Sequence, residues 1–373
     1  MRVLEAISDT NIGGAGILLY SRLKHSNRNR FKTVVVLPKG SALTSRFQSI
    51  HIPTISIDGC YDQSLDLFTI PTLCSIIRSY RPSLVNCHGC LSFRIAAKIC
   101  HVPVIIYTRH CAFPLPSWQR SILIKKGIGV LQTKLSPNIV AVAGAAKTNL
   151  IQMGVNPNRI HVIINGAEKL KKIPPQECLA LRQTLEIPKD AFVVGICARL
   201  EACKGHQELL EAACFLLQED KGYHFLIIGN GSLEQTLKQF CIQHKIEKYV
   251  HFIGFAEDVT PYMNIIDIQV NCSNGTETSS LALSEGMSLG KPAIASNYGG
   301  NPYMIQHGIN GLIYSLGKPS ELAIQIRRLR QNPTLYDQCS KNALLRFERE
   351  LNAERMTKET EAFYQRLVSD FAM

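Results

Sequence analysis

The first half of this sequence contains very few acidic residues. Residues 1–165 hold 19 lysines and arginines but 5 aspartates and glutamates, whereas residues 166–373 hold 22 and 24. A basic half beside a nearly neutral half indicates that the first half faces an anionic partner, because clustered charge of one sign attracts the other. Nucleic acid, an anionic membrane surface and a phosphorylated acceptor are all open on charge alone.

Long apolar runs are also missing. No stretch of about 18 uninterrupted apolar residues occurs, so we expect no membrane-spanning helix. Glu5 and Asp9 stand where a signal peptide would have its apolar region, so we expect a cytoplasmic protein. The 13 cysteines are odd in number and form no visible disulfide framework, which also favours a reducing compartment.

Signatures of metal and nucleic-acid binding are scarce. The one suggestive spacing, Cys87-His88-Gly89-Cys90, has no second ligand pair, and no Asp-x-Asp motif occurs. We therefore expect neither a metal nor another cofactor. With one tryptophan and 7% aromatic residues the chain lacks a stripe of aromatics for stacking bases, so nucleic acid is not an expected partner.

Short apolar strands alternate with helical segments along the whole chain. The strands expected in the first half cover residues 2–7, 33–37, 84–86, 104–107, 138–143 and 161–164. Those expected in the second half cover residues 192–197, 225–228, 251–253, 268–270, 293–296 and 311–314. This alternation, in a chain of 373 residues, predicts an α/β protein with two parallel-sheet domains and a ligand cleft between them.

The stretch from Asn271 to Gly300 carries the strongest indication of a site. A strand leads into a loop of small and hydroxylated residues, 273–280, and then into a helix, whose free N–H groups suit anions and hydroxyls. Glu277 and Glu285 lie eight residues apart. Eight residues of helix rise about 12 Å, more than the roughly 5–9.5 Å that glycosidase carboxylates need. We therefore predict that the two glutamates face separate parts of one extended ligand.

Other candidate residues follow the expected strands. Arg199 and Lys204 flank a loop between a strand and a helix, where two cations could neutralise a diphosphate, although solvated surface charge is an equal alternative. Gly13 and Gly14 form a turn of the phosphate-binding kind, with an incomplete glycine spacing that also suits a turn without ligand. His110 also falls at a strand end, where ligands of such sheets bind.

A basic amphipathic segment runs from Pro114 to Leu135. It combines Trp118 and Ile122 with four basic residues and contains no acid. Such a segment suits peripheral contact with an anionic membrane, and an ordinary helix with a solvated basic face is an equal alternative.

Several motifs together resemble the glycosyltransferases of family GT4, which have the GT-B fold. The resemblance covers nearly the whole chain and rests on the motifs GICARLEACKG, VIINGAE, SNYGGNP, the E-x7-E spacing of Glu277 and Glu285, and NAERMTKETEAFYQRLV near the C-terminus. It implies two Rossmann-like doubly wound domains facing across a cleft, at residues 1–168 and 169–351. Residues 352–373 would form a helix that crosses back to the first domain.

The resemblance also implies an activity and its residues. We expect a retaining, metal-independent hexosyltransferase that moves a sugar from a nucleotide sugar, expected to be UDP-linked, to an acceptor hydroxyl in cell-envelope polysaccharide or glycolipid synthesis. A nucleotide-sugar epimerase of similar fold is the alternative. The implied catalytic residues are Arg199, Lys204, Glu277 and His110, and the implied donor-binding residues are Gly13, Gly14, Gly231, Gly254, Thr278, Ser279, Ser280, Leu281 and Glu285.

Two departures from the family pattern stand out. Thr278-Ser279-Ser280 replaces the glycines that usually follow Glu277, so the nature of the sugar is open. Tyr303 stands where an acid is common. The expected partners are a nucleotide-sugar donor, a sugar or lipid-linked acceptor and the inner face of a membrane.

Overall fold

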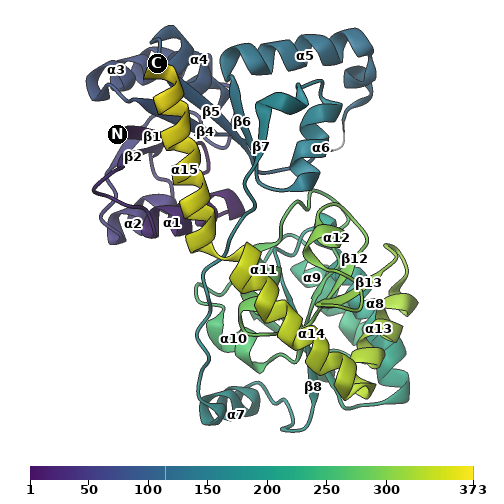
Figure 1. The fold of residues 1–373 in the computed structure, drawn as a ribbon. Coiled ribbons are helices and arrows are strands. Elements are labelled where there is room, and N and C mark those ends of the chain that lie inside the picture. The colour runs from purple at the N-terminus through teal and green to yellow at the C-terminus, as the bar shows by residue number, and fades with distance from the viewer. Residues whose placement is uncertain (114, 373) are drawn as a thin grey trace. The chain divides into compact units, whose positions relative to one another are not determined.

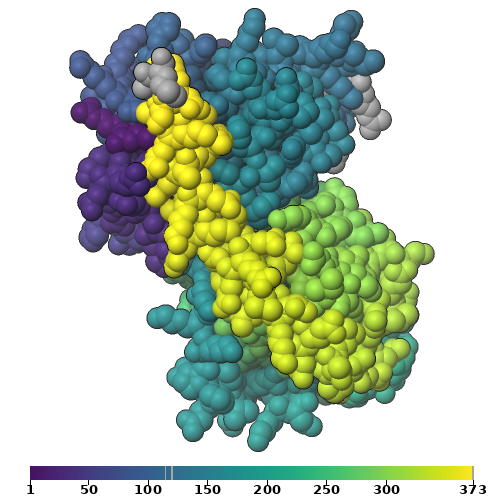
Figure 2. All heavy atoms as spheres, viewed as in Figure 1, coloured from purple at the N-terminus to yellow at the C-terminus, as the bar shows by residue number. Residues whose placement is uncertain are grey.

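The chain forms two compact units. A computed structural model describes residues 1–113 and 115–372. The first unit comprises Met1–Gly166 and Ala353–Met373, and the second comprises Ala167–Asn352. The chain therefore passes between the units twice. In Figure 2 the C-terminal helix, drawn in yellow, lies across atoms of the first unit.

The first unit is built on a parallel sheet with the strand order β3-β2-β1-β4-β5-β6-β7. Its strands are β1 (Arg2–Ile7), β2 (Lys32–Pro38), β3 (Thr54–Ile57), β4 (Leu84–His88), β5 (Val104–Arg109), β6 (Asn138–Ala141) and β7 (Ile160–Val162). Its helices are α1 (Gly14–Lys24), α2 (Leu43–Ser49), α3 (Ile70–Tyr80), α4 (Leu91–Ile99), α5 (Ile122–Leu135), α6 (Gly144–Gln152) and α15 (Ala353–Ala372). Short 3-10 turns cover Leu67–Thr69, Ser117–Arg120 and Pro157–Arg159.

The second unit repeats this plan with the order β10-β9-β8-β11-β12-β13. Its strands are β8 (Phe192–Cys197), β9 (Tyr223–Ile228), β10 (Val250–Gly254), β11 (Ile268–Asn271), β12 (Ala293–Ser296) and β13 (Gly311–Tyr314). Its helices are α7 (Pro175–Thr184), α8 (His206–Glu219), α9 (Glu234–Gln243), α10 (Thr260–Ile265), α11 (Leu281–Ser288), α12 (Asn301–Met304), α13 (Pro319–Gln331) and α14 (Pro333–Arg346). Single turns of other helix types cover Ala202–Lys204, Glu247–Tyr249 and Phe347–Leu351.

Both sheets are buried on their two faces, which explains their apolar strands. Val35 of β2 and Leu226 of β9 are fully buried, like most of their neighbours in the same strands. A parallel sheet covered by helices on both sides requires such near-continuous apolar strands. The predicted fold class is confirmed: the protein is α/β, with two Rossmann-like doubly wound units.

The strand order reverses once in each sheet. In the first unit the reversal lies between β1 and β4, and in the second it lies between β8 and β11. Figure 1 shows β1 and β4 side by side in the first unit. Ligands of doubly wound sheets bind outside the carboxyl ends of the strands at this reversal. The fold thus marks one candidate binding region in each unit.

The segment predicted to be basic and amphipathic contains α5. The first residue of that predicted segment, Pro114, lies outside the residues that the structure describes. Ile122 and Leu123 are 71% and 80% exposed, whereas Gly129 packs against the backbone of Gly154 so closely that a Cβ would approach its oxygen to 1.8 Å. Among the residues that the structure describes, no helix is both long and apolar enough to cross a membrane.

Candidate active site

A pocket in the second unit lies at the reversal of its strand order. The carboxyl ends of β8 and β11 and the start of α11 form its walls. Lys204 and Asn271 line it together with Cys197, Ser273 and Ser280. A concave site with a small number of convergent polar groups is typical of ligand binding. This pocket is therefore the candidate site of the second unit.

Glu277 lies in the loop before α11 and accepts three hydrogen bonds. Lys204 Nζ donates to its Oε2 at 2.9 Å, Ser273 Oγ at 2.8 Å and Asn271 Nδ2 at 3.3 Å. Burial alone would raise the pKa of Glu277, but the charge of Lys204 and these hydrogen bonds outweigh burial and lower the pKa. The structure therefore brings Lys204 and Glu277 together, and it keeps Glu277 ionised.

A second layer of polar side chains fixes this arrangement from behind. The Ser273 backbone N–H donates to Asn271 Oδ1 at 2.9 Å, and Ser296 Oγ donates to the Ser273 carbonyl at 2.7 Å. Asn301 Nδ2 donates to Ser296 Oγ at 3.1 Å. All four residues are buried. Sequence analysis did not single them out as site residues, although an asparagine that ends a buried strand, as Asn271 does, is a usable signal.

Two glycines let the loop after β12 pack directly on the Glu277 loop. A Cβ on Gly299 would lie 2.3 Å from the carbonyl oxygen of Glu277, and one on Gly300 would lie 1.7 Å from that of Thr278. The Gly300 N–H donates to the Glu277 carbonyl at 3.1 Å. The Gly-Gly pair therefore holds the backbone of Glu277 in place.

Glu285 lies in the second turn of α11 and has a different environment. Burial, followed by the negative charge of Asp258, raises the pKa of Glu285 to about 7. No described residue donates a hydrogen bond to its carboxylate. The helix itself begins at Leu281, because Ser280 Oγ caps it by accepting from the Leu283 N–H at 3.3 Å. Glu277 is in the loop and Glu285 in the helix, so the two do not form a pair.

The other hydroxyl residues of this loop are already engaged. Thr278 is buried, and Ser279 Oγ donates a hydrogen bond to Met304 Sδ at 3.7 Å. The Ser280 hydroxyl caps the start of α11. The loop is therefore shaped by its own contacts before a ligand enters.

Arg199 follows β8 and extends into solvent. Its guanidinium makes no hydrogen bond or ion pair with any described residue, although Glu201 lies near enough to feel its charge. Glu201 accepts from Ser232 Oγ at 2.8 Å, which ties the loop after β8 to the loop after β9. Arg199 is thus an available cation on the same loop as Lys204.

Glycines allow these neighbouring loops to touch. A Cβ on Gly229 would lie 2.1 Å from the carbonyl oxygen of Ala198, and one on Gly231 would lie 2.6 Å from that of Leu200. The Gly229 N–H donates to the Gly254 carbonyl at 2.8 Å. The predicted glycines Gly231 and Gly254 therefore lie at the carboxyl ends of adjacent strands, β9 and β10.

The remaining predicted residues belong to the first unit. Gly13 is the N-cap of α1 and Gly14 is its first residue, with nothing within 4 Å of a Cβ placed on Gly14. His110 follows β5 directly, and its Nε2 lies 2.7 Å from Nδ1 of His88, the last residue of β4. Burial, followed by the positive charges of His88 and Arg109, lowers the pKa of His110 well below its usual range.

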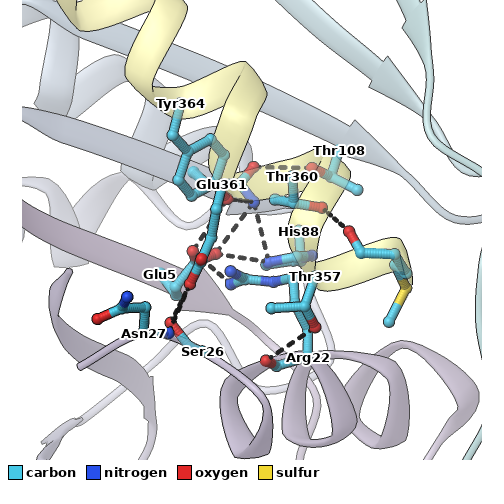
Figure 3. Close-up of polar contacts among 12 residues, drawn as sticks. Glu5, Arg22, Ser26, Asn27, His88, Thr108, Thr357, Thr360, Glu361 and Tyr364 are labelled. Carbon is cyan, nitrogen blue, oxygen red and sulfur yellow. Dashed lines mark hydrogen bonds and ion pairs between the residues drawn. The ribbon is translucent and has the colours of Figure 1, made fainter. Parts of the chain in front are cut away.

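A buried carboxylate that sequence analysis missed lies behind His88. Glu5, in β1, accepts from Arg22 at 2.5 Å, from Asn86 at 3.0 Å and from Tyr364 at 3.0 Å, and it lies 2.9 Å from His88 Nε2. Figure 3 shows Arg22, His88 and Tyr364 converging on it from three elements. A lone glutamate within an apolar strand is the signal that could have revealed it.

The predicted site residues thus form two groups, one in each unit. In the second unit, Lys204 lines the pocket and bonds to Glu277, while Arg199 lies on the loop of Lys204 and Glu285 lies in α11. In the first unit, Gly13, Gly14 and His110 lie at the carboxyl edge of the sheet. Across residues 1–113 and 115–372, no cluster of three or more His, Cys, Asp or Glu side chains is placed to hold a metal ion. A doubly wound unit with two cations and an ionised carboxylate suits an enzyme that acts on an anionic, hydroxyl-rich ligand.

Comparison with known proteins identifies the class. Residues 179–346 match the family Glycosyl transferases group 1, and residues 12–168 match Glycosyltransferase Family 4. The putative glycosyltransferase EpsD of Bacillus subtilis is 26% identical over 298 residues, which cover 75% of this chain and 77% of EpsD. An Escherichia coli protein, UDP-Gal:alpha-D-GlcNAc-diphosphoundecaprenol alpha-1,3-galactosyltransferase, is 26% identical over 75% of this chain and 74% of its own length.

Solved structures share the fold over the full length. Anabaena HepE in complex with UDP and glucose superposes with a TM-score of 0.84 at 23% identity, covering 98% of this chain and 99% of HepE. A glycosyltransferase from Rickettsia africae superposes with a TM-score of 0.81 at 18% identity, covering 98% of each chain. The chain belongs to the family 4 glycosyltransferases of the GT-B fold, and it is a glycosyltransferase.

Proposed function

We propose that this enzyme transfers a hexose from a UDP-sugar to a hydroxyl of a lipid-linked or polysaccharide acceptor, with retention of anomeric configuration and without a metal ion. The observation that carries the proposal is the Lys204–Glu277 pair in the pocket at the carboxyl ends of β8 and β11. The printed names of two relatives support it, since the E. coli protein uses UDP-galactose and HepE was solved with UDP and glucose.

Lys204 and Arg199 are the groups that would bind the donor diphosphate. Both lie on the loop between β8 and α8, and Arg199 is exposed and without a partner among the described residues. Two cations supply charge-assisted hydrogen bonds to phosphate oxygens and stabilise the negative charge that develops as the sugar leaves. This arrangement supports the proposal that the diphosphate is held without a metal ion.

Glu277 would orient the donor sugar. Its Oε2 already accepts from Lys204, Ser273 and Asn271, so it suits hydrogen bonds to sugar hydroxyls better than covalent attack. In the proposed reaction the acceptor oxygen bonds to the anomeric carbon as the bond from that carbon to the diphosphate oxygen breaks. The acceptor proton passes to the leaving diphosphate on the same face, which retains the configuration.

Glu285 would hold the nucleoside end of the donor. Its carboxylate, without a donor among the described residues, can accept from the ribose hydroxyls. Gly231 and Gly254 leave the ends of β9 and β10 free of side chains, where the base would lie. In the first unit, Gly13, Gly14 and His110 are the groups proposed to face the donor from the other sheet edge.

Product analysis tests the proposal. The enzyme would be incubated in EDTA with a panel of UDP-hexoses and a lipid-diphosphate-linked sugar acceptor, and the product linkage would be read from the anomeric proton coupling by NMR. We expect a glycoside with the anomeric configuration of the donor. An inverted product would contradict retention, full dependence on added metal would contradict metal independence, and an epimer formed from donor alone would contradict transfer as the activity.

Peripheral membrane contact is proposed for the acceptor side. The basic first unit carries exposed apolar residues on α5, with Leu123 80% and Ile122 71% exposed beside Lys125 and Lys126. Apolar insertion combined with basic charge is the usual basis of such binding.

Liposome flotation tests this contact. We expect binding to vesicles that contain anionic lipid and clear loss in the Ile122→Glu/Leu123→Glu variant. Ile242→Glu is the matched control, because it changes an isoleucine of the second unit that is 63% exposed. Equal flotation with neutral and anionic lipid would contradict the proposal.

A further inference from the structure

Two cysteines meet at the carboxyl edge of the first sheet. Cys60 follows β3, and Cys90 lies between β4 and the start of α4. Their thiols share a hydrogen bond, and both side chains belong to the same buried apolar cluster. The two residues are 2% and 3% exposed. All 13 cysteines of the chain are free, so this is a contact between two thiols.

The backbone around the two thiols keeps them together. The Leu91 and Ser92 N–H groups both donate to the Ser64 carbonyl, at 2.6 and 3.1 Å. Ser92 Oγ accepts from the Asp66 N–H at 2.6 Å and donates to the Asp66 carbonyl at 2.9 Å. The loop that carries Cys60 is therefore bound to the first turn of α4. A disulfide requires two sulfurs already held in contact, and this loop supplies that contact.

A second thiol contact, farther along the same two helices, serves as an internal comparison. Figure 1 shows α3 and α4 side by side. Cys74 of α3 hydrogen-bonds to Cys100, the C-cap of α4, and Cys100 Sγ donates to the Cys74 carbonyl at 3.7 Å. Burial, as the largest cause, raises the pKa of the Cys74 thiol, so Cys74 is a poor nucleophile at neutral pH.

The contact between Cys60 and Cys90 is chemically asymmetric. The hydrogen bond from Cys90 is the largest cause that lowers the pKa of Cys60, and the same bond, followed by burial, raises the pKa of Cys90. A lowered pKa increases the thiolate fraction, which is the form that reacts with peroxides. Cys60 is therefore the thiol that reacts first, and Cys90 is the thiol placed to attack the product.

Access to Cys60 depends on the loop that follows it. Residues 61–65 are all exposed. Gly59, Cys60 and Asp62 have φ angles of 108°, 55° and 52°, in the left-handed region that residues other than glycine adopt at a cost. An exposed loop with a strained backbone opens locally more readily than a helix or a central strand, so a small oxidant can reach the sulfur.

We propose that Cys60 and Cys90 form an oxidation site, at which a peroxide converts the two thiols to a disulfide that fixes the loop after β3 to the start of α4. The Cys60 thiolate attacks one peroxide oxygen and becomes a sulfenic acid, while hydroxide leaves and takes up the proton that Cys60 released. The Cys90 thiol then attacks the sulfenic sulfur, the S–S bond forms, and water leaves with the thiol proton. Two thiols are oxidised, and one hydrogen peroxide is reduced to two waters.

The disulfide acts on a neighbouring loop through Asp62. The Asp62 N–H donates to the Ser8 carbonyl, and the Thr10 N–H donates to Asp62 Oδ1, both at 2.9 Å. The segment that contains Ser8 and Thr10 leads into Gly13, the N-cap of α1. Fixing the loop after β3 therefore also restrains the turn before α1, whichever substrate the enzyme uses.

Peptide mapping tests the site directly. The reduced, native protein would be treated with a small excess of hydrogen peroxide at pH 7.5, alkylated and digested, and linked peptides would be identified by mass spectrometry. We expect a Cys60–Cys90 disulfide that dithiothreitol reverses. It should also form in Cys74→Ser, which removes a thiol from the comparison pair. Cys60 and Cys90 that stay unlinked, or a Cys60 oxidised to the sulfinic acid instead, would overturn the proposal.

Thermal unfolding and hydrogen exchange test what the disulfide does. Because a cross-link across about 30 residues restricts the unfolded chain, oxidation should raise the melting temperature by about 5 to 10 °C. The amides of Thr10 and Asp62 should exchange more slowly in the oxidised protein. Cys74→Ser should show both changes on oxidation, and Cys60→Ser should show neither.

Two results of these measurements would contradict the inference. One is a melting temperature that falls when the disulfide forms, and the other is an equal rise in Cys60→Ser. If Cys60→Ser fails to fold, Cys90→Ser takes its place, and peptide mapping of the wild type decides without either variant.

Discussion

Lys204 and Glu277 hold each other in the absence of substrate. Their contact is 2.9 Å long, and the side chains of Lys204 and Glu277 are 21% and 7% exposed. Removing one partner from such a partly buried pair leaves the other without compensation, which costs more than the loss of a surface ion pair. A bound diphosphate would share Lys204 with Glu277, so both groups are already oriented when the donor arrives.

If Glu285 binds the ribose as proposed, its raised pKa predicts donor binding that depends on pH. Because the carboxyl ionises only near pH 7, it can accept from both ribose hydroxyls above that pH but not below. We expect the affinity for UDP-glucose, whose diphosphate diester does not titrate in this range, to fall up to about tenfold per unit below pH 7. Titration calorimetry between pH 5.5 and 8.5 would measure this. Glu285→Gln should bind weakly at every pH, and a wild-type affinity that does not vary with pH would contradict the assignment.

His206 is a buried imidazole that contributes no contact to the site. It is 1% exposed, and neither ring nitrogen has a hydrogen-bond partner among the described residues. Burial, followed by the charge of Lys204, lowers the pKa of His206 to about 4. The unfolded chain takes up this proton near pH 6.5, so the folded state loses stability as pH falls from about 6.5 toward 4.

We therefore expect His206→Leu to stabilise the protein. The gain should be about 1 kcal/mol at neutral pH, from removing two unsatisfied nitrogens, and should grow as pH falls below 6.5. Urea unfolding at pH 7.5 and 5.5 would measure it. His244→Leu, on the surface of the second unit, should show no such growth. A gain from His206→Leu that shrinks at pH 5.5 would show that the ring is not held neutral.

At the site, glycines allow the backbone of one loop to pack closely against the backbone of the next. Gly300→Ala would place a methyl group 1.7 Å from the Thr278 carbonyl, so the loop that carries Glu277 must move. We expect kcat/KM to fall about 10²-fold, because small displacements of a binding group have large effects on rate. Gly144→Ala, where nothing lies within 4 Å of the new Cβ, should leave kcat/KM unchanged. Equal activity of both variants would contradict the tight packing described here.

The long elements were predictable, and the short ones were not. Apolar strands such as β2 and β9 are buried on both faces, and that burial requires the apolar runs visible in the sequence. The edge strand β3 has four residues, of which two are polar, so it contains no apolar run. Sequence analysis therefore did not predict it. Helices α2 and α12, of seven and four residues, are also too short to show a clear helical periodicity.

The site was predictable where a residue follows a strand and carries charge. Arg199 and Lys204 follow β8 and Glu277 follows β11, so the motif spacing placed all three at the carboxyl ends of two neighbouring strands. Asn301 and Glu5 were missed because their roles depend on partners from distant segments, Ser296 in one case and Tyr364 in the other. Such contacts follow from the packing of the whole unit and leave no local pattern.

At the scale of the whole molecule, the chemistry is divided between two units of the same topology. The second unit supplies two cations and two carboxylates on the segments that follow β8 and β11, and the first supplies a histidine pair backed by a buried carboxylate. Because α15 returns to the first unit and Tyr364 bonds to Glu5, the end of the chain is part of the structure behind His110.

The central claim is that Lys204 helps bind a nucleoside diphosphate without metal. Calorimetric titration of UDP in EDTA, on wild type, Lys204→Ala and Lys238→Ala, tests it most directly. Lys238 is the matched control, because it forms a 2.7 Å ion pair with Glu234 on α9, apart from the residues that line the pocket. Circular dichroism would first check that all three proteins are folded. We expect Lys238→Ala to bind UDP like wild type. We expect Lys204→Ala to bind UDP about 10- to 100-fold more weakly, because it loses one charge-assisted hydrogen bond. Wild-type affinity in Lys204→Ala, or no binding of UDP by the wild type, would contradict the account.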